Sequence, residues 1–583
     1  MAHSYNSLLF SALRRVVAPV ALGVLGLAAP ARAQAPAWQA VQATTQLSGN
    51  VSAVSASTVD LTGSVFLVGT FRGTVSFGSH SLTSPGGACF IAKWRPGTGF
   101  HWAQRLDVST VANVSFNGAA LYVAGSYAAP TATLGPLTLT SAGGSDGYVA
   151  RLTDLGSTCS VEWAQSLGGP ADDQILTMAH RGQSVFVGGD FASSTLTLGS
   201  LSLLNSSPGS TDAFVAKVAD AGTAGEPYWA ERIGGPGRDY VGALAVDNVR
   251  LYVGGGFYGA TTTIGSTILT NTSTSPALAT SDAFVARLTD GGFSSSGFSW
   301  AERIGGPVFE EVSALAVNGS SVYVAGRFNS LTATLGSTNL TNASGSFDTF
   351  VAKLTDNTSA AALAWAYRAG GSGHDAPAAL AVRGSKLLMA GAFYSATVSF
   401  GPHTLTNASP LDTYDIFLTQ LEDAGSSAAF TWAQRAGGSG DDDVRSLAVR
   451  GSTVYAAGSV MPTAGFGTHS VTTPAGSQVA YLASLTDLTL STAAPAWAAG
   501  LQLYPNPARH AATVQLPAIT GATQEEATLT LTDALGRAVR TQQVTLGPAG
   551  TRTELALDAL PAGLYQLRVQ VGAQQVSRAL ALE

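Results

Sequence analysis

The sequence predicts an all-β protein in which a seven-bladed β-propeller is followed by a separate small β-domain. Three observations support this prediction. Tryptophans recur at spacings of 61, 66, 71, 65 and 67 residues, the same strand-like segments return around each of them, and the repeated region lacks helical periodicity. The recurring tryptophans are Trp102, Trp163, Trp229, Trp300, Trp365 and Trp432.

Each repeat contains four predicted strands. The first and second strands, such as Leu244–Val246 and Val322–Gly326, are short apolar runs typical of buried strands. An Asn-Gly or Arg-Gly pair between them predicts a tight hairpin turn, because glycine adopts a positive φ without strain. Phe350–Leu354 is an alternating third strand with Lys353 expected on its outward face. Trp-Ala-x-Arg begins the fourth strand, and we expect its indole to be buried between neighbouring repeats.

The number of repeats follows from the second-strand segment, which occurs seven times. Four strands per repeat, at a period of 61 residues or more, predict propeller blades rather than a solenoid. The seven segments begin at Val65, Leu121, Val185, Leu251, Val322, Leu387 and Val454. Two further tryptophans, Trp38 and Trp497, lie 64 residues before and 65 residues after the series. One of them is expected to begin the strand that completes the last blade, and the sequence leaves open which.

The first 33 residues have the three parts of a secretory signal peptide. Arg14 and Arg15 supply positive charge, Val16–Ala29 is apolar, and Ala-Arg-Ala at 31–33 has the small-x-small cleavage pattern. We expect cleavage between Ala33 and Gln34, with export to the periplasm. The alternative is an uncleaved anchor, although the apolar run is shorter than the roughly 20 residues of a spanning helix. No later segment is long enough to span a bilayer.

The repeat ends near Asp487. Residues 488–500 are rich in Ala, Thr, Ser and Pro, as a linker would be, and residues 501–583 contain a new set of short alternating segments. We therefore expect a signal peptide (1–33), a propeller (34–487), a linker (488–500) and a C-terminal β-domain (501–583).

The repeated segments resemble the bacterial β-propeller repeats known as SBBP repeats. The resemblance rests on Gly-Gly-x-x-x-Asp, Ala-Leu-Ala-Val, Val-Tyr-Val-Ala-Gly and Asp-x-Phe-Val-Ala-Lys-Leu, and it covers the chain from Trp38 to Asp487. The first repeat departs most, because it lacks the Gly-Gly-x-x-x-Asp segment. Membership of this family implies a propeller and an extracellular setting, and it implies no activity.

Three ordered motifs near the C-terminus resemble the type A sorting domain of type IX secretion cargo. The motifs are Leu-Tyr-Pro-Asn-Pro, Asp-Ala-Leu-Gly-Arg and Leu-Pro-Ala-Gly-Leu-Tyr, and their marker residues are Pro505, Asn506, Pro507, Gly536, Gly563 and Tyr565. The resemblance implies a small Ig-like β-sandwich, recognition by the type IX secretion machinery, a secreted or outer-membrane-associated surface protein, and a Bacteroidetes-like host. The chain ends in Glu583 rather than in the lysine-rich tail of many relatives. The alternative is an ordinary accessory sandwich.

The composition argues against nucleic acid as a partner and offers no catalytic motif. Only 11% of the residues are charged and the net charge is −7, whereas nucleic-acid binding needs clustered Lys and Arg. Eight scattered histidines form no His-Glu-x-x-His motif and no pair with metal-ligand spacing. We therefore assign no catalytic, cofactor-binding or metal-ligating residue, and we expect no enzymatic activity.

An acidic residue recurs ten positions after most tryptophans, on a glycine-rich loop. One interpretation is calcium, which prefers several oxygen ligands. The other, which we favour, is that each carboxylate holds the N–H groups of its own loop, since a residue repeated in nearly every blade usually serves the blade. These residues are Asp173, Asp239, Glu310, Asp375 and Asp442, and a second recurring set before the third strand is Asp146, Asp212, Asp282 and Asp348.

The leading functional prediction is an exported binding or structural module. A glycan or protein ligand would bind on a loop face or at the central channel, where loops vary most freely. The alternative is an exported hydrolase or lyase acting on polysaccharide, which would need acids and bases unique to one or two blades. His374 and Asp375 form the one adjacent polar pair that departs from the repeat in this way.

Overall fold

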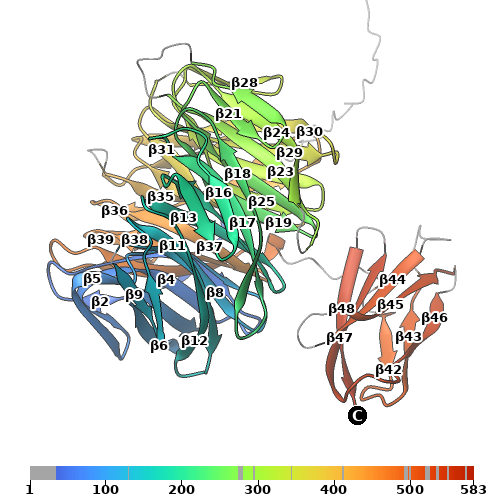
Figure 1. The fold of residues 1–583 in the computed structure, drawn as a ribbon. Coiled ribbons are helices and arrows are strands. Elements are labelled where there is room, and N and C mark those ends of the chain that lie inside the picture. The colour runs from blue at the N-terminus through green and yellow to red at the C-terminus, as the bar shows by residue number, and fades with distance from the viewer. Residues whose placement is uncertain are drawn as a thin grey trace, which may run out of the picture. The chain divides into compact units, whose positions relative to one another are not determined.

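The computed structural model describes residues 35–583, apart from 129, 274–279, 293–295, 343, 410–412, 491–496, 498–499, 519–525, 534–537, 548–549 and 572–573. Strands dominate the described residues, which contain short 3₁₀ turns such as η1 (Leu488–Leu490) and no α-helix (Figure 1). The all-β prediction is confirmed. The predicted signal peptide and its cleavage site between Ala33 and Gln34 lie outside the described residues.

Seven four-stranded antiparallel arrangements, here called sheets 1 to 7, fill the described part of residues 38–486. Sheet 1 contains β3 (Val51–Val59), β4 (Val65–Phe77), β5 (His80–Arg95) and β6 (Gly99–Leu106); sheet 2 contains β7 (Thr110–Phe116), β8 (Leu121–Tyr127), β11 (Asp146–Asp154) and β12 (Cys159–Leu167); sheet 3 contains β13 (Asp173–Arg181), β14 (Ser184–Phe191), β17 (Asp212–Asp220) and β18 (Gly225–Gly234).

The later sheets repeat this plan. Sheet 4 contains β19 (Asp239–Asp247), β20 (Arg250–Phe257), β23 (Asp282–Asp290) and β24 (Ser296–Gly305); sheet 5 contains β25 (Glu310–Asn318), β26 (Ser321–Phe328), β29 (Asp348–Asp356) and β30 (Ala361–Ala369); sheet 6 contains β31 (Asp375–Arg383), β32 (Lys386–Phe393), β35 (Asp415–Asp423) and β36 (Ala428–Gly438); sheet 7 contains β37 (Asp443–Arg450), β38 (Thr453–Val460), β41 (Val479–Thr486) and β1 (Trp38–Ala43).

Each sheet has the four predicted strands, and the second and third are almost completely buried. The first strands contact one another in a cyclic order: β3 contacts β7, and the contacts continue through β13, β19, β25, β31 and β37, which in turn contacts β3. Neighbouring sheets therefore pack face to face over apolar cores that each draw side chains from two or three successive sheets.

A hairpin that the sequence analysis did not predict lies between the second and third strands of each repeat. The Thr-Leu-Gly-x-x-x-Leu-Thr segments form it, and its strands are β9 and β10 (Thr131–Leu134, Leu137–Thr140), β15 and β16 (Thr195–Leu198, Leu201–Leu204), β21 and β22 (Thr261–Ile264, Thr267–Thr270), β27 and β28 (Thr332–Leu335, Thr338–Thr341), β33 and β34 (Thr397–Phe400, His403–Thr406), and β39 and β40 (Thr463–Phe466, His469–Thr472). In sheet 1 the hairpin is continuous with β4 and β5, and β2 (Thr45–Gln46) pairs with its edge.

The strand that completes sheet 7 comes from the N-terminal side of the described chain. β1 pairs with β41, whereas Trp497 lies in the apolar core of the C-terminal domain. Trp38 pairs with Leu485 in the way that Phe430 pairs with Leu421 in sheet 6. The expectation that a strand beginning at one of the two outer tryptophans completes the last sheet is confirmed for Trp38. In register, however, Ala40 and not Trp38 has the position of the recurring tryptophans.

The recurring tryptophans join each sheet to the next one. Each indole is buried, and its Nε1–H donates a hydrogen bond to the aspartate at or just after the end of the third strand of the following sheet. The bonds are Trp102 to Asp154 (3.1 Å), Trp163 to Asp220 (2.9 Å), Trp229 to Asp290 (3.1 Å), Trp300 to Asp356 (3.0 Å), Trp365 to Asp423 (3.0 Å) and Trp432 to Asp487 (3.1 Å).

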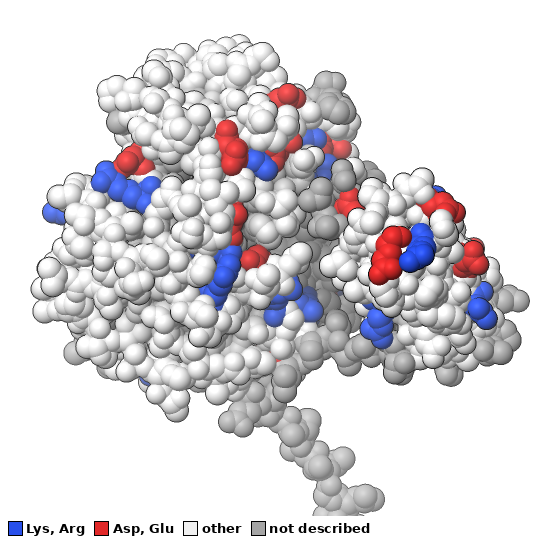
Figure 2. Space-filling model, turned by 90° about the horizontal axis from the view of Figure 1, so that it is seen from below, with Lys and Arg blue, Asp and Glu red and all other residues white. Residues whose placement is uncertain are grey.

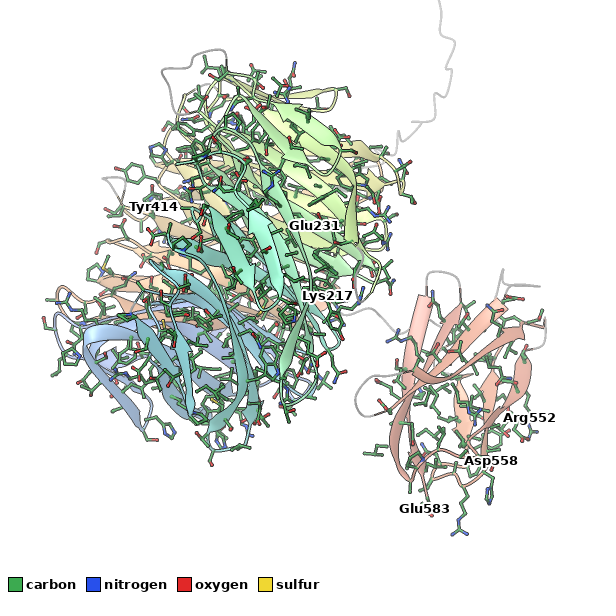
Figure 3. All side chains as sticks on the ribbon, viewed as in Figure 1. Lys217, Glu231, Tyr414, Arg552, Asp558 and Glu583 are labelled. Atoms are coloured by element: carbon green, nitrogen blue, oxygen red, sulfur yellow. The ribbon has the colours of Figure 1, made fainter. Side chains whose placement is uncertain are left out.

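The lysines of the third strand serve the same junctions. The prediction that Lys353 faces outward is wrong, because Lys93, Lys217 and Lys353 are all buried (Lys217 is labelled in Figure 3). A buried ammonium group needs a charged partner, and the aspartate of the next sheet provides it. The ion pairs are Lys93 with Asp154, Lys217 with Asp290 and Lys353 with Asp423.

The C-terminal strands form two sheets that share no strand with sheets 1 to 7. One sheet has the order β42 (Gln502–Tyr504), β43 (Ala511–Leu516), β46 (Thr551–Ala556), and the other has the order β45 (Ala538–Thr545), β44 (Glu526–Thr532), β47 (Gly563–Val571), β48 (Gln574–Leu582). Their inward residues, together with Trp497 and Leu501, form a separate apolar core.

Replacing Trp300 by Ala is expected to lower the free energy of unfolding by roughly 3–5 kcal/mol, because it removes a buried aromatic side chain. Trp300→Phe keeps most of the apolar volume and loses the Nε1–H donor to a buried carboxylate, so a smaller loss of about 2 kcal/mol is expected. Chemical denaturation of both variants measures these values. An unchanged unfolding curve for Trp300→Ala would contradict the buried junction.

Candidate functional site

At one edge of each sheet the first and third strands begin and the second strand ends. The face formed by these edges is here called the loop face. In sheet 6, Asp375 begins the first strand and pairs with Phe393 at the end of the second, and Phe393 pairs with Asp415 at the start of the third. The connections before the first strand, after the second and before the third therefore lie together at this edge. The recurring acidic residues and His374 all belong to these connections.

The acidic residue that begins the first strand holds its own loop. Asp375 accepts hydrogen bonds from Ser395 Oγ (2.7 Å) and from the N–H of Gly371 (2.8 Å). Asp442 accepts from the N–H groups of Gly438 (2.7 Å) and Met461 (3.1 Å). These hydrogen bonds are the ones expected if each carboxylate stabilises its own loop. Among the described residues, no group of three or more His, Cys, Asp and Glu side chains could hold a metal ion.

Burial shifts the pKa of these acidic residues. Burial, and to a lesser degree repulsion from the second set of acidic residues, raises the pKa of each carboxyl against the hydrogen bonds that lower it. The pKa is raised to about 6 for Asp173 and Asp375, and to about 7 for Asp239, Glu310 and Asp442. Arginines pair with three of the second set and with Asp415, which has the equivalent position in sheet 6. The pairs are Arg232 with Asp212, Arg303 with Asp282, Arg368 with Asp348 and Arg435 with Asp415.

A continuous row of aromatic rings distinguishes sheets 4 to 6 on the loop face; we call it the aromatic strip. Consecutive ring centroids lie 5.1–6.3 Å apart, and all six side chains are partly or fully exposed. The strip contains, in order, Tyr258, Phe309, Phe347, His374, Tyr394 and Tyr414 (Tyr414 is labelled in Figure 3).

The aromatic strip occupies repeat positions that are not aromatic elsewhere. After the second strand, Tyr258 and Tyr394 replace residues such as Ala192 and Met461. Before the first strand, Phe309 and His374 replace Asp172, Arg238 and Asp441; before the third, Phe347 and Tyr414 replace Ser145, Thr211, Ser281 and Gln478. The sequence analysis singled out His374 and missed its neighbours, although alignment of the repeats by these positions would have found them.

Two ion pairs and the Asp441 carboxylate, which accepts the N–H of Tyr414 (3.1 Å), flank the strip. The Arg327 guanidinium lies 4.5 Å from the centroid of the Phe347 ring and pairs with Glu311 (2.6 Å), which also accepts a hydrogen bond from Tyr240 Oη (3.0 Å). On the far side, Arg445 pairs with Asp443 (3.0 Å). The N–H of Phe347 donates to His374 Nδ1 (3.2 Å), which fixes the orientation of the imidazole.

A cavity of about 380 Å³ lies at the end of the strip that contains Tyr414. Its volume is within the size range of ligand sites. Its lining includes Phe347, His374, Tyr414, Arg327, Asp441 and Arg445. A second hollow, of about 290 Å³, is lined by residues from the first strands of all seven sheets. On the surface shown in Figure 2, charged groups are few and scattered among uncharged side chains.

The marker residues of the C-terminal motifs hold the last strand in place. Both Pro505 and Pro507 follow cis peptide bonds. Between them, the Asn506 side chain donates to the carbonyl of Ala579 (2.8 Å) and accepts from the N–H of Ala581 (2.9 Å), both in β48. Tyr565 Oη donates to the carbonyl of Pro561 (2.6 Å), which closes the turn before Gly563. Gly536 lies outside the described residues.

Comparison with known families identifies the C-terminal region. Residues 502–583 match the family described as "Secretion system C-terminal sorting domain". The chain thus carries a type IX sorting domain, which indicates secretion by the type IX system, interaction with its machinery and a secreted or cell-surface location. The match does not extend to the repeats, so the resemblance to SBBP repeats stays a prediction. No helix in the described ranges has the length and apolar character to cross a membrane.

Comparison with solved structures gives only weak likenesses. A protein of unknown function from Dyadobacter fermentans is 10% identical, with 77% of this chain and 99% of that chain covered and a TM-score of 0.33. A Synechocystis apocarotenoid oxygenase mutant is 9% identical, with 89% and 95% covered and a TM-score of 0.30. Dimeric latent PorU from Porphyromonas gingivalis is 12% identical, with 59% and 32% covered and a TM-score of 0.13. No curated protein matches the chain. Likenesses this weak carry no argument about function.

The buried carboxyls predict that the folded protein is more stable at mildly acidic than at alkaline pH. Their pKa values rise from 3.8 or 4.5 to about 6 or 7 on folding, so the stability they contribute is complete at low pH and is lost as the pH rises toward 7. Burial lowers the pKa of His180 from 6.5, so this residue favours the folded state at higher pH. It is one group against five carboxyls. Thermal unfolding should therefore occur at a higher temperature at pH 5.5 than at pH 8.

Asp375→Asn is the matched variant, because it removes one of these titrations and keeps the side-chain size. The difference in melting temperature between pH 5.5 and pH 8 should shrink in this variant. A melting temperature that rises from pH 5.5 to pH 8 in the unmodified protein would contradict the assignment.

Proposed function

We propose that this protein is an exported, non-catalytic binding protein whose residues 34–487 form a seven-bladed β-propeller and whose loop face binds a saccharide along the aromatic strip. In this proposal residues 1–33 are a cleaved signal peptide that directs the chain to the periplasm, residues 488–500 are a linker, and residues 501–583 are the sorting domain, an Ig-like sandwich. The propeller belongs to the SBBP-repeat type.

The cyclic contacts of the first strands support the ring. In a propeller the first strand of each blade lines the axis, so seven first strands around one hollow are expected. Completion of sheet 7 by β1 also fits, because a ring is commonly closed by pairing strands from opposite ends of the repeated region. An open stack of sheets would leave β37 and β3 without mutual contact, whereas they are neighbours.

The aromatic strip is the observation that supports a binding role. Its rings interrupt the repeat on adjacent sheets and meet one another, whereas a residue that serves blade packing would recur around the ring. Partly exposed aromatic rings offer apolar faces to the C–H surfaces of sugar rings. The paired charges beside them, such as Arg327 with Glu311, supply donors and acceptors for hydroxyl groups.

The setting of the acidic residues favours binding over hydrolysis. Glycoside hydrolysis needs two carboxyls that reach the scissile bond. The carboxyls with raised pKa near the strip, Asp375 and Asp442, are buried and are hydrogen-bonded to their own loops. His374 Nδ1 is likewise engaged by a backbone N–H.

The experiment is to screen the secreted protein on an array of neutral oligosaccharides, together with Tyr394→Ala and Phe347→Ala variants. Each variant removes one partly exposed ring of the strip and should weaken binding by about tenfold or more, as is usual for aromatic anchors of binding sites. Tyr504→Ala, which removes a partly exposed tyrosine of the C-terminal domain, is the matched control and should bind like the unmodified protein.

Two results would contradict the proposal. Undiminished binding by both strip variants would place the ligand elsewhere, and release of shortened products from a bound oligosaccharide would favour the hydrolase or lyase alternative.

A further inference from the structure

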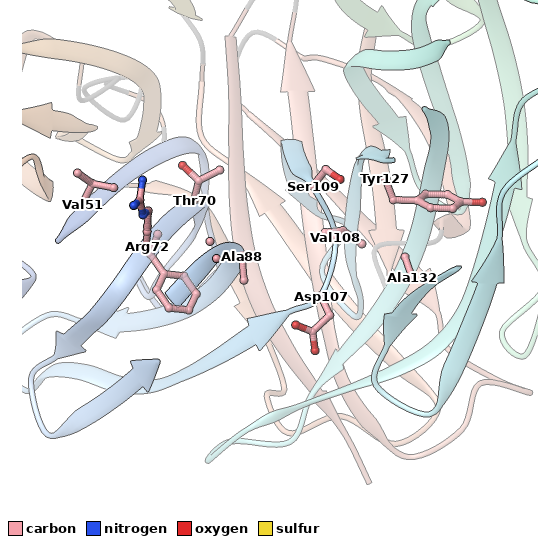
Figure 4. Close-up of a pocket in the computed structure, with 12 residues that line it drawn as sticks. Val51, Thr70, Arg72, Ala88, Asp107, Val108, Ser109, Tyr127 and Ala132 are labelled. Atoms are coloured by element: carbon pink, nitrogen blue, oxygen red, sulfur yellow. The ribbon is translucent and has the colours of Figure 1, made fainter. Parts of the chain in front are cut away.

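The loop face has another hollow, between sheets 1 and 2 (Figure 4). It shares no lining residue with the cavity at the aromatic strip or with the hollow between the first strands. Its volume is about 580 Å³. The lining includes Thr70, Arg72, Gly87, Asp107, Ser109 and Tyr127. All but Tyr127 are exposed, and the apolar Phe71, Val108 and Ala132 also line the hollow, so it is open and offers both polar and apolar groups.

This hollow lies where the first repeat is shortened. Val111 pairs with Gly125 as Ile175 pairs with Gly189, so Ser109 has the position of Asp173. Five residues (168–172) connect the fourth strand to this position in the next repeat, but only two (107–108) do so here. The missing residues are those of the Gly-Gly-containing loop that fills the equivalent space at other junctions.

This junction lacks the two recurring buried carboxyls of the loop face, the one that begins the first strand and the one that begins the third. Ser109 replaces one of them, and Ala88 replaces the other, because it pairs with Phe71 as Asp282 pairs with Phe257. Arg105 has lost the buried partner that its counterparts keep, and it pairs instead with Asp107, on the surface. At this junction the loop that would bond to its own buried carboxyls is absent, and an open space with exposed polar groups takes its place.

Arg72, on β4 beside the hollow, is an exposed cation without a counter-charge. It has no ion pair and no hydrogen-bonded side chain among the residues that the structure describes. The other arginines at the loop-face strand ends and connections are ion-paired. They are Arg105, Arg232, Arg238, Arg303, Arg327, Arg368, Arg435 and Arg445.

The chemistry of these groups selects the ligand. A guanidinium binds a planar carboxylate through two parallel hydrogen bonds. Asp107, also on the wall of the hollow, is paired with Arg105, and its carboxylate can accept hydrogen bonds from hydroxyl groups. Ser109 Oγ accepts from the N–H of Ala128 (3.0 Å), which leaves its own O–H to donate.

We propose that this hollow binds a uronic-acid unit of an acidic saccharide, with the sugar carboxylate on Arg72 and the sugar hydroxyls on Asp107 and Ser109. A volume of about 580 Å³ is within the range of small-ligand sites. The proposal does not depend on saccharide binding at the aromatic strip, which involves other sheets.

The test is isothermal titration calorimetry of the full secreted protein carrying Tyr394→Ala, which is expected to weaken neutral-saccharide binding at the aromatic strip, with digalacturonic acid as the probe. Cellobiose serves as a neutral disaccharide of similar size, and acetyl-alanyl-alanine with a free carboxylate represents a peptide terminus. We expect digalacturonic acid to bind. Cellobiose should bind at least about tenfold more weakly, because it lacks the carboxylate and so loses one charge-assisted pair. The peptide keeps the carboxylate but lacks the ring hydroxyls for Asp107 and Ser109, so it should also bind more weakly.

Three variants assign the binding to Arg72. Arg72→Gln should weaken digalacturonic acid binding by about tenfold or more, and Arg72→Lys should weaken it less, since the charge is kept and the fork is lost. Arg509→Gln, which removes an exposed arginine of the C-terminal domain, should leave it unchanged. Arg72 has no partner to lose among the described residues, so neither of its variants is expected to disturb folding, and thermal unfolding checks this.

Four results would overturn the proposal: no binding of digalacturonic acid, equal binding of cellobiose, undiminished binding by Arg72→Gln, or preferential binding of the peptide through Arg72. Each of them leaves the neutral-oligosaccharide result for Tyr394→Ala unaffected, so failure of this site and failure of the aromatic strip are distinguishable.

Discussion

The hydrogen bond from a buried indole to the aspartate of the next sheet is the interaction on which the repeat depends. A carboxylate is buried at low cost only where donors surround it. Asp290 receives bonds from Trp229, Lys217 and Arg181 as well as from its own loop. Burial raises its pKa, but these hydrogen bonds outweigh burial and lower it. The Trp, Lys and Asp segments of the sequence are thus one structural unit, assembled from two successive repeats.

The junction between sheets 7 and 1 lacks this unit on both sides. Ala40 stands where the indole would be, and Pro96 stands where the aspartate would be, since Trp94 pairs with Val65 as Leu354 pairs with Val322. Other contacts replace it. Ser57 and Ser446 hydrogen-bond through their hydroxyls (2.8 Å), and a shared apolar core joins the two sheets. Loss of the donor and of the acceptor together is physically consistent, because either one alone would be a buried polar group without its partner.

The sequence predicted what depends on local pattern and missed what depends on pairing between repeats. The tryptophan period and the apolar second strand located the sheets correctly. Lys353 was expected to face outward because its strand alternates, but its partner Asp423 lies 70 residues further along the chain, where no local pattern reveals it. The shift of Trp38 is likewise a matter of register, which a spacing of 64 residues cannot show.

The candidate sites were harder to predict for the same reason. His374 stood out as a polar departure from the repeat, but the aromatic strip became apparent only when Phe347 and Tyr394 were placed on adjacent sheets. The hollow beside Arg72 arises from a deletion, and a deletion is visible only once the strands are aligned by their pairing. The sorting motifs were recognised in order, and the contacts of Asn506 with β48 give a physical reason for that residue.

Closure of the ring between sheets 7 and 1 is the central claim, and a cross-link tests it most directly. Ser57 and Ser446 are close enough that a Ser57→Cys, Ser446→Cys double variant should form a disulfide under oxidising conditions, whereas each single variant should not. The native cysteines, Cys89 and Cys159, are both buried and should not compete. The closed ring predicts an intramolecular cross-link across about 390 residues, with a higher melting temperature in the oxidised form. Two thiols that stay free, or that link only different molecules, would contradict it.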